Sequence, residues 1–176
     1  MSRGLGDVYK RQLKDHVAAF NEVKYILSEG EHKVIDSFDE IDAIGHRIVQ
    51  GGDRYTKSVL VTEKVVKDVE ELAPLAPLHN PAHLMGYRAC LKVVGPDVPQ
   101  VFVFDTSFHS TMPPKAYMYA VPYEYYEKYA VRRYGFHGTS HKFVSHRVAD
   151  KMGKDIIHFI RSKVKLCLLY TSPSPR

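Results

Sequence analysis

Four residues of chemically versatile types stand where the pattern of the chain changes: Arg47, His79, Asp105 and His137. Each lies at the end of an expected strand or in a loop loosened by glycine or proline, and none lies on an amphipathic face. An arginine and two histidines can offset spreading negative charge, and a carboxylate can hold Mg²⁺. The set therefore fits the transfer of a phosphoryl group.

Two other chemistries fit the sequence less well. No serine or cysteine occupies an elbow of the type Gly-x-Ser-x-Gly, which disfavours hydrolysis through an acyl-enzyme. His137 and His141 are four residues apart, as two zinc ligands on one helix would be. Gly138 and a helix cap expected at Thr139 or Ser140 interrupt that helix, so zinc binding is disfavoured as well.

The aspartate follows the clearest strand signal of the chain. Residues 101–104 read Val-Phe-Val-Phe, an apolar and β-prone run that places Asp105 at the carboxyl end of a buried strand. Open α/β sheets bind their ligands at such ends. The following loop, residues 106–111, is crowded with hydroxyl and histidine side chains. We therefore expect a site at this end of the sheet.

Arg47 and His79 are placed by two further elements. Arg47 lies in a strand expected over residues 43–49, which a Gly-Gly turn closes. The alternative is that this arginine only pairs with a structural carboxylate. His79 directly precedes a helix that Asn80 would cap, so it would lie near the positive end of the helix dipole.

His137 is expected in a glycine-rich turn that lets the backbone approach a ligand closely, ahead of a helix that runs to Met152. Amphipathic spacing predicts two more helices, over residues 17–27 and 62–72. Strands and helices in this mixture indicate an α/β protein.

The composition is that of an ordinary globular protein, with 44% hydrophobic and 26% charged residues. Without a membrane-length apolar run or the apolar core of a signal peptide, the sequence predicts a cytoplasmic location. The net charge of +5 comes from residues 1–12 (three cations, one anion) and residues 163–176 (three cations), which leaves zero between them. A charge-neutral body argues against nucleic-acid binding.

Both ends of the chain differ from its body. Residues 1–12 show neither helical nor strand periodicity, and the tail ends in a Ser-Pro repeat. We interpret residues 1–12 and 161–176 as non-native, similar to translated sequencing adapters, and residues 13–160 as a first-domain piece of a longer gene product. The alternative is a native pair of flexible termini.

Four segments, in order and with fitting separations, make the chain resemble the acetate kinase family. They are residues 45–52 (GHRIVQGG), 75–81 (LAPLHNP), 104–114 (FDTSFHSTMPP) and 134–141 (YGFHGTSH). The resemblance implies an α/β fold with an incomplete ribonuclease-H-like domain of the actin-like ATPase type. It also implies a homodimeric parent that uses ATP and Mg²⁺ to phosphorylate acetate, reversibly forming acetyl phosphate.

The resemblance carries roles onto residues of these segments. Arg47 would bind the carboxylate and the moving phosphoryl group, and His79 would help to place the substrate. Asp105 would serve the metal or orient the carboxylate, and His137 would help to bind ATP and donate to the transition state. Three apolar neighbours would line the pocket for the methyl group of acetate: Val49, Leu78 and Phe136.

Departures from the family pattern limit what this chain can do alone. The phosphate loop rich in Asn and Ser, the later His-Leu-Gly-Asn-Gly segment and the adenosine-binding half are absent. We therefore expect an inactive piece that carries most of the acetate pocket. The alternatives are a kinase of propionate or another short carboxylate and, in a different class, a non-catalytic interaction module suggested by the tyrosine-rich residues 117–129.

Overall fold

A computed structural model describes residues 12–155 of the chain. The two ends that the sequence sets apart lie outside the described residues, except for Gln12. Helices and strands follow in the order α1 (His16–Ser28), β1 (Ile44–Ile48), β2 (Val59–Leu60), α2 (Glu63–Glu71), α3 (Asn80–Val94), β3 (Gln100–Phe104), α4 (Pro114–Tyr117), α5 (Glu124–Tyr129) and α6 (Gly138–Met152). Single turns of 3-10 helix occupy Phe38–Glu40, Ala73–Leu75 and Ser107–His109. The expected α/β class is confirmed.

The described residues form two compact units, each built from two stretches of chain. One unit comprises residues 12–44 and 84–99, and the other comprises residues 45–83 and 100–155. The four residues that the sequence singles out all belong to the second unit. The site is therefore described within that unit.

A three-stranded mixed sheet positions the site, with β3 in the centre between β1 and β2. β2 runs antiparallel to β3 and pairs Val59 with Phe102. Just past the end of β3, the backbone N–H of Asp105 donates to the carbonyl oxygen of Ile48, over 2.9 Å. The carboxyl ends of β1 and β3 therefore meet at one edge of the sheet, so Arg47 and Asp105 are brought together.

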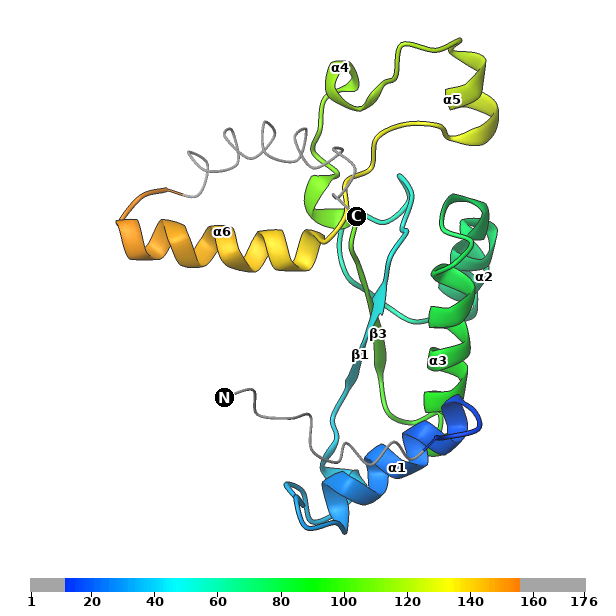
Figure 1. Cartoon of the computed structure of the whole chain (residues 1–176), viewed down its shortest axis with the longest axis vertical. Coiled ribbons are helices and arrows are strands. Elements are labelled where there is room, and N and C mark those ends of the chain that lie inside the picture. Colours follow the sequence, from blue (N-terminus) through cyan, green and yellow to red (C-terminus); the bar gives the residue numbers. More distant parts are fainter. Residues whose placement is uncertain (1–11, 156–176) are drawn as a thin grey trace, which may run out of the picture. The chain divides into compact units, whose positions relative to one another are not determined.

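The core of this unit gathers around β3, whose residues alternate between buried and half-buried. Phe102, Phe104 and Ile48 are fully buried, as is Val69 from α2. Figure 1 shows α2 and α6 on opposite sides of the sheet. The alternation arises because successive side chains of a strand point to opposite faces.

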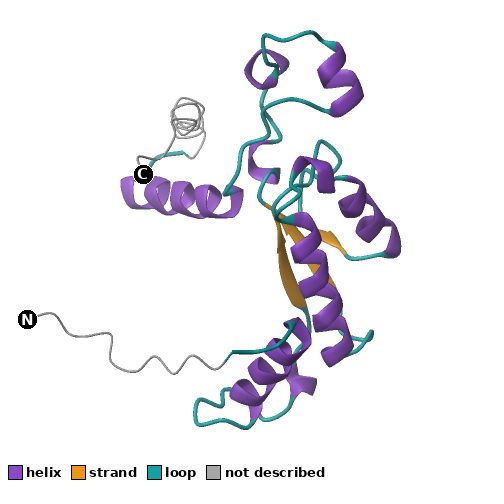
Figure 2. Cartoon of the chain, turned by 45° about the vertical axis from the view of Figure 1, so that its right-hand side comes forward, coloured by secondary structure: helices purple, strands orange, loops and turns teal. Residues whose placement is uncertain are grey.

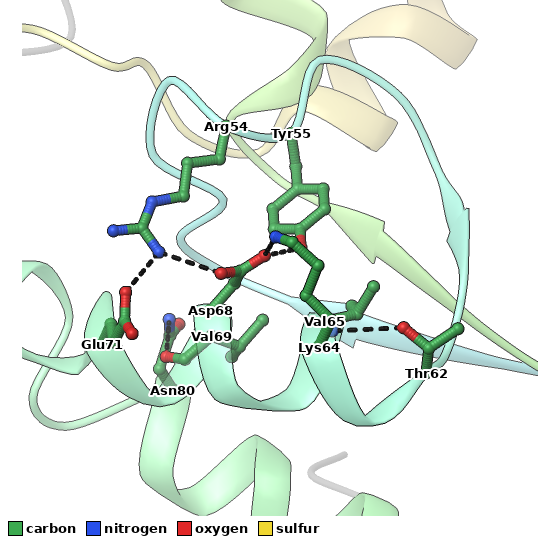
Figure 3. A network of polar contacts seen from close by, with 9 residues as sticks. All are labelled: Arg54, Tyr55, Thr62, Lys64, Val65, Asp68, Val69, Glu71 and Asn80. Carbon is green, nitrogen blue, oxygen red and sulfur yellow. Dashed lines mark hydrogen bonds and ion pairs between the residues drawn. The ribbon is translucent and has the colours of Figure 1, made fainter.

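A polar network ties the loop after β1 to α2 (Figure 3). Asp68 of α2 accepts hydrogen bonds from the hydroxyl of Tyr55 and from Lys64. Arg54 bridges Asp68 and Glu71, with N–O distances of 3.1 and 2.6 Å. Burial, together with the nearby Asp68 carboxylate, raises the pKa of Tyr55 to about 12. The ring of Tyr55 stacks on that of Phe104 in the core, and the two ring centres are 4.7 Å apart. The network fixes the loop that follows Arg47.

Most predicted elements are present, but the predicted start of the last helix is wrong. α1 and α2 cover the expected residues, and Thr62 caps α2 by accepting from the backbone N–H of Val65. The cap predicted at Thr139 or Ser140 is not formed there, because α6 begins at Gly138 and His137 is its N-cap residue. His137 therefore stands directly at the N-terminus of α6.

The tyrosine-rich residues 117–129 lie in and around α4 and α5. Figure 2 shows these two helices beyond the end of the sheet, connected to it by loops. Neither helix contains a buried residue, and the guanidinium carbon of Arg132 lies 3.6 Å from the ring centre of Tyr117. These aromatic side chains belong to the surface, not to the core around β3.

Candidate active site

The site is built around an ion pair between Arg47 and Asp105. Nε of Arg47 donates to both carboxylate oxygens of Asp105 at 3.1 Å, and Nη2 donates to Oδ2 at 2.6 Å. The aspartate is buried, with 2% of its surface exposed, whereas 57% of the arginine side chain is exposed. The buried carboxylate thus holds one edge of the guanidinium and leaves the other edge accessible.

The pair keeps the arginine charged and oriented. Its hydrogen bond to Asp105 raises the pKa of Arg47 above its already high ordinary value. Among the described residues, Nη1 of Arg47 has no hydrogen-bond partner. Arg47 does pair with a buried carboxylate, as the alternative interpretation expected, but this pairing occupies only one edge of its guanidinium. The outer N–H groups remain suited to an anion.

His79 is placed by a reciprocal contact between the start of α3 and the segment after β1. The side chain of Asn80 accepts from the backbone N–H of Gln50 at 3.1 Å and donates to the carbonyl oxygen of the same residue at 3.0 Å. A third bond, of 3.4 Å, reaches the carbonyl oxygen of Val69 on α2. Since Asn80 and Gln50 are buried, this contact fixes the backbone of His79 relative to Arg47.

His137 is brought to the same place by close backbone contacts. The N–H of Gly138 donates to the carbonyl oxygen of Asp105 over 2.9 Å, and a β-carbon on Gly138 would overlap that oxygen. His137 itself has φ of 54°, in the left-handed region. A non-glycine residue pays about 1–3 kcal/mol for such a conformation, and these residues cluster at functional sites.

A cavity of about 460 Å³ opens among these groups. Its walls include every residue that the sequence singles out: Arg47, Val49, Leu78, His79, Asp105, Phe136 and His137. Three neighbours that were not singled out complete the lining: Leu75, Ala76 and Pro77. They come from the same loop as Leu78 and His79, so the motif that pointed to those two also contained them.

The lining suits a small anion with an apolar end. Arg47 is the cation that lines the cavity, and its charge is fixed by the buried Asp105. Apolar surface is supplied by Val49, which is buried, and by Leu78 and Phe136, which are 85% and 47% exposed. A carboxylate can therefore meet the guanidinium while its alkyl group meets apolar side chains.

The described residues do not make a metal site. Within residues 12–155 there is no group of three or more His, Cys, Asp or Glu side chains that could hold an ion. Among the residues that the structure describes, Asp105 is the one carboxylate that lines the cavity, and both its oxygens accept from Arg47. The residues present thus do not fit Mg²⁺ on their own, and we derive no step through a metal.

One histidine beside the site was missed by the sequence reasoning. His83 lies one turn after His79, and its ring centre is 6.2 Å from that of His79. Burial lowers the pKa of His83, and the charges of Arg47 and His79 lower it further, against a smaller opposing effect of Asp105. The spacing of four residues between the two histidines was the signal that could have found it.

Within the described part of the chain, no helix is both long and apolar enough to cross a membrane.

Comparison with protein families gives a match to the acetokinase family over residues 3–164. Among similar proteins, an acetate kinase of Thermotoga maritima is 56% identical over 149 residues, which are 85% of this chain and 37% of that protein. An acetate kinase 2 of Clostridium perfringens is 59% identical over 144 residues, or 82% of this chain and 36% of that protein.

Two solved structures share the fold. A crystal structure of Porphyromonas gingivalis acetate kinase matches with a TM-score of 0.76 and 46% identity, over 83% of this chain and 36% of that one. A propionate kinase from Francisella tularensis matches with a TM-score of 0.71 and 44% identity, over 79% of this chain and 35% of that one. The chain thus spans little more than a third of the length of the proteins it matches.

Proposed function

Since the chain belongs to the acetokinase family, we propose that its full-length parent transfers the γ-phosphoryl group of ATP to acetate and forms acetyl phosphate reversibly. The observation that carries this proposal is the cavity in which Arg47, fixed by Asp105, faces apolar side chains. An acetate carboxylate on the guanidinium would place its methyl group toward Val49, Leu78 and Phe136.

In the proposed reaction, a carboxylate oxygen of acetate attacks the γ-phosphorus while the bond from that phosphorus to the β,γ-bridging oxygen breaks and ADP leaves. Arg47 would hold the attacking carboxylate and offset charge on the moving group. Because Asp105 already fixes the guanidinium, little reorganisation is needed when that charge develops. This supports a role for Asp105 in orienting Arg47.

His79 and His137 both line the cavity and would have different roles in the reaction. His79 would help to position the acetate, and His137 would donate to the phosphoryl oxygens in the transition state and help to bind ATP. α6 begins directly after His137, and the N-terminus of a helix favours negative charge. This local arrangement supports the assignment of His137 to the phosphoryl group.

ATP as donor, Mg²⁺, a homodimeric state and a cytoplasmic location complete the proposal for the parent. No residue of this chain is assigned to the metal or to a dimer contact. Since the chain spans little more than a third of its relatives, we expect it to carry the acceptor pocket without turning over by itself.

Propionate is the second candidate acceptor, because one matching structure is that of a propionate kinase. One methylene in an apolar pocket is worth about 1–3 kcal/mol, so the lining by itself does not choose between the two acids. Comparing kcat/KM of the parent for acetate, propionate and butyrate identifies the acceptor, and the acid with the highest value is the physiological class.

The main test traps the acyl phosphate with hydroxylamine in the presence of ATP, Mg²⁺ and acetate. The parent is expected to form product, and Arg47→Ala is expected to lower the rate by about 10² to 10³, because it removes a donor that acts in the transition state. Arg54→Ala is the matched control, since this arginine pairs with Asp68 and Glu71 and does not line the cavity. A parent that forms no acyl phosphate would refute the proposed function. A fully active Arg47→Ala variant would refute the assignment of the pocket.

A further inference from the structure

His83 presents a buried polar atom that has no partner. Nδ1 of this side chain is inaccessible to solvent and makes no hydrogen bond within the described residues. Buried side-chain nitrogens are nearly always paired in folded proteins, so such an atom calls for an explanation. The ring contacts that of His79, but it does not line the cavity and has no role in the proposed reaction.

The backbone that carries this ring is held in place. The backbone N–H of His83 donates to the carbonyl oxygen of His79 at 2.9 Å, within the first turn of α3. That turn is fixed to the segment after β1 by the buried pair of Asn80 and Gln50. The backbone of His83 is therefore fixed to the segment that follows Arg47, and the ring lies close enough to Arg47 to be affected by its charge.

The surroundings favour a neutral ring. Burial lowers the pKa of His83, and the charges of Arg47 and His79 lower it further, against a smaller opposing effect of Asp105. A ring N–H pointing at a guanidinium would be repelled, whereas a lone pair would be attracted. Nδ1 is thus suited to accept a hydrogen bond and Nε2 to carry the proton.

The guanidinium of Arg47, for its part, has a hydrogen-bond donor without an acceptor among the described residues. Asp105 occupies Nε and Nη2 of Arg47, and Nη1 has no partner among residues 12–155. With more than half of its side chain exposed, Arg47 is held along one edge only. A second acceptor would stop the guanidinium from pivoting about that edge.

We propose that His83 is a positioning residue for Arg47, whose neutral ring offers Nδ1 as an acceptor that fixes the guanidinium, directly or through one water, when an anion occupies the cavity. The inference rests on the proposed role of Arg47 in binding the acceptor carboxylate. It adds a second anchor to the one that Asp105 supplies, and it gives the buried nitrogen its partner.

The test compares His83→Asn, His83→Gln and His83→Leu in the full-length parent. The side-chain amide of asparagine can place an oxygen near the position of Nδ1, whereas that of glutamine reaches the position of Nε2. We expect His83→Leu and His83→Gln to raise KM for acetate about tenfold, the usual effect of losing a hydrogen bond to a charged group, with KM for ATP unchanged. His83→Asn should stay within about threefold of the parent.

The pattern among the variants separates positioning from a merely structural role. If His83→Asn is impaired as much as His83→Leu, or if His83→Gln retains the KM of the parent, the inference is wrong. Should the leucine variant fail to fold, the asparagine and glutamine variants still decide, since both are polar and similar in size.

A spectroscopic measurement gives a readout that does not need turnover. In the parent labelled with ¹⁵N-histidine, the His83 signals, assigned by their loss in His83→Gln, should show a pyridine-like Nδ1 that shifts when acetate is added. A pyrrole-like Nδ1, or one that acetate leaves unmoved, would overturn the inference. Loss of turnover in Arg47→Ala with normal kinetics in all His83 variants would overturn the inference and leave the proposed function intact.

Discussion

Among single residues, Gly138 shows how tightly the pieces of the site are joined. Its N–H donates to the carbonyl oxygen of Asp105, and a β-carbon added to this glycine would overlap the same oxygen. His137, the residue before it, is held at positive φ by the same turn. The position of the histidine therefore depends on a glycine that itself does no chemistry.

Replacing Gly138 by alanine is expected to push this turn away from the end of β3. The added methyl group would overlap backbone, which cannot rotate away, so the free energy of unfolding should fall by about 1–3 kcal/mol, the usual cost of overpacking. Urea denaturation of the chain measures the change. Gly86→Ala is the control: it lies inside α3 with no atom within 4 Å of the new carbon, and it should stabilise by about 0.5–1 kcal/mol. Equal stability of Gly138→Ala and the unchanged chain would contradict this account of the turn.

The residues singled out by type and spacing all line one cavity, because each motif joins a strand end or a loop to its candidate side chain. A pairing of Arg47 with a structural carboxylate was foreseen only as an alternative, and Asp105 was not named as that carboxylate. His83 was missed although its spacing of four residues from His79 can be seen in the sequence. Gln50 could not be found in this way, because its partner Asn80 lies 30 residues further along the chain. A local pattern contains no information about such partners.

At the scale of elements, the contact between α3 and the segment after β1 fixes the backbone of His79 and His83. Asn80 bonds to both Gln50 and Val69, so the first turn of α3 is tied to the segment after β1 and to α2. The sequence suggested Asn80 as a helix cap. In the structure the helix begins at this residue, and its side chain makes contacts between elements.

Asn80→Ala is expected to loosen this junction. The backbone N–H and carbonyl oxygen of Gln50 would lose their partners while buried, which costs about 1–3 kcal/mol in unfolding free energy. In the full-length parent, KM for acetate should rise because His79 and His83, at the start of α3, lose their fixed position. Lys128→Ala, which removes an exposed ion pair with Glu124, should change stability by less than about 1 kcal/mol. Similar unfolding curves for Asn80→Ala and Lys128→Ala would argue against the junction.

Long, periodic elements were predictable and short ones were not. α2 and β3 follow from their apolar spacing, because packing on a core imposes it, and α1 shows the same kind of spacing although it contains no buried residue. The helices α4 and α5 have only 4 and 6 residues, so they are too short to show an apolar period. The start of α6 was missed because the chain enters the helix through His137 in a left-handed conformation, without a side-chain cap.

At the scale of the whole molecule, the two compact units interleave along the chain. The boundaries fall after residues 44, 83 and 99, so the first two lie inside β1 and α3. No run rich in Pro, Gly or Ser marks the first two, because a helix or strand that runs through a boundary needs the same kinds of residue on both sides. The third boundary does follow such a run, residues 95–99 (GPDVP), which is too short to indicate a linker. The sequence therefore predicted the body as one piece.

The whole molecule also sets the scope of the proposed chemistry. The cavity lies within one unit of a chain that covers little more than a third of its relatives. Large apolar side chains on α6 are exposed, among them Phe143, Val144 and Met152, while its buried residues are small. Tests of the mechanism consequently belong in the full-length parent.

The central claim is that Asp105 acts through Arg47, which in turn binds the acceptor. A double-mutant cycle in the parent tests it most directly, with Arg47→Ala, Asp105→Asn and the double variant compared by kcat/KM for acetate in the hydroxylamine assay. We predict that Arg47→Ala lowers the value by about 10² to 10³ and that adding Asp105→Asn lowers it little further, because residues that act as a unit are not additive. Two losses that multiply would show that Asp105 acts independently of Arg47, as a metal ligand would, and would contradict the account.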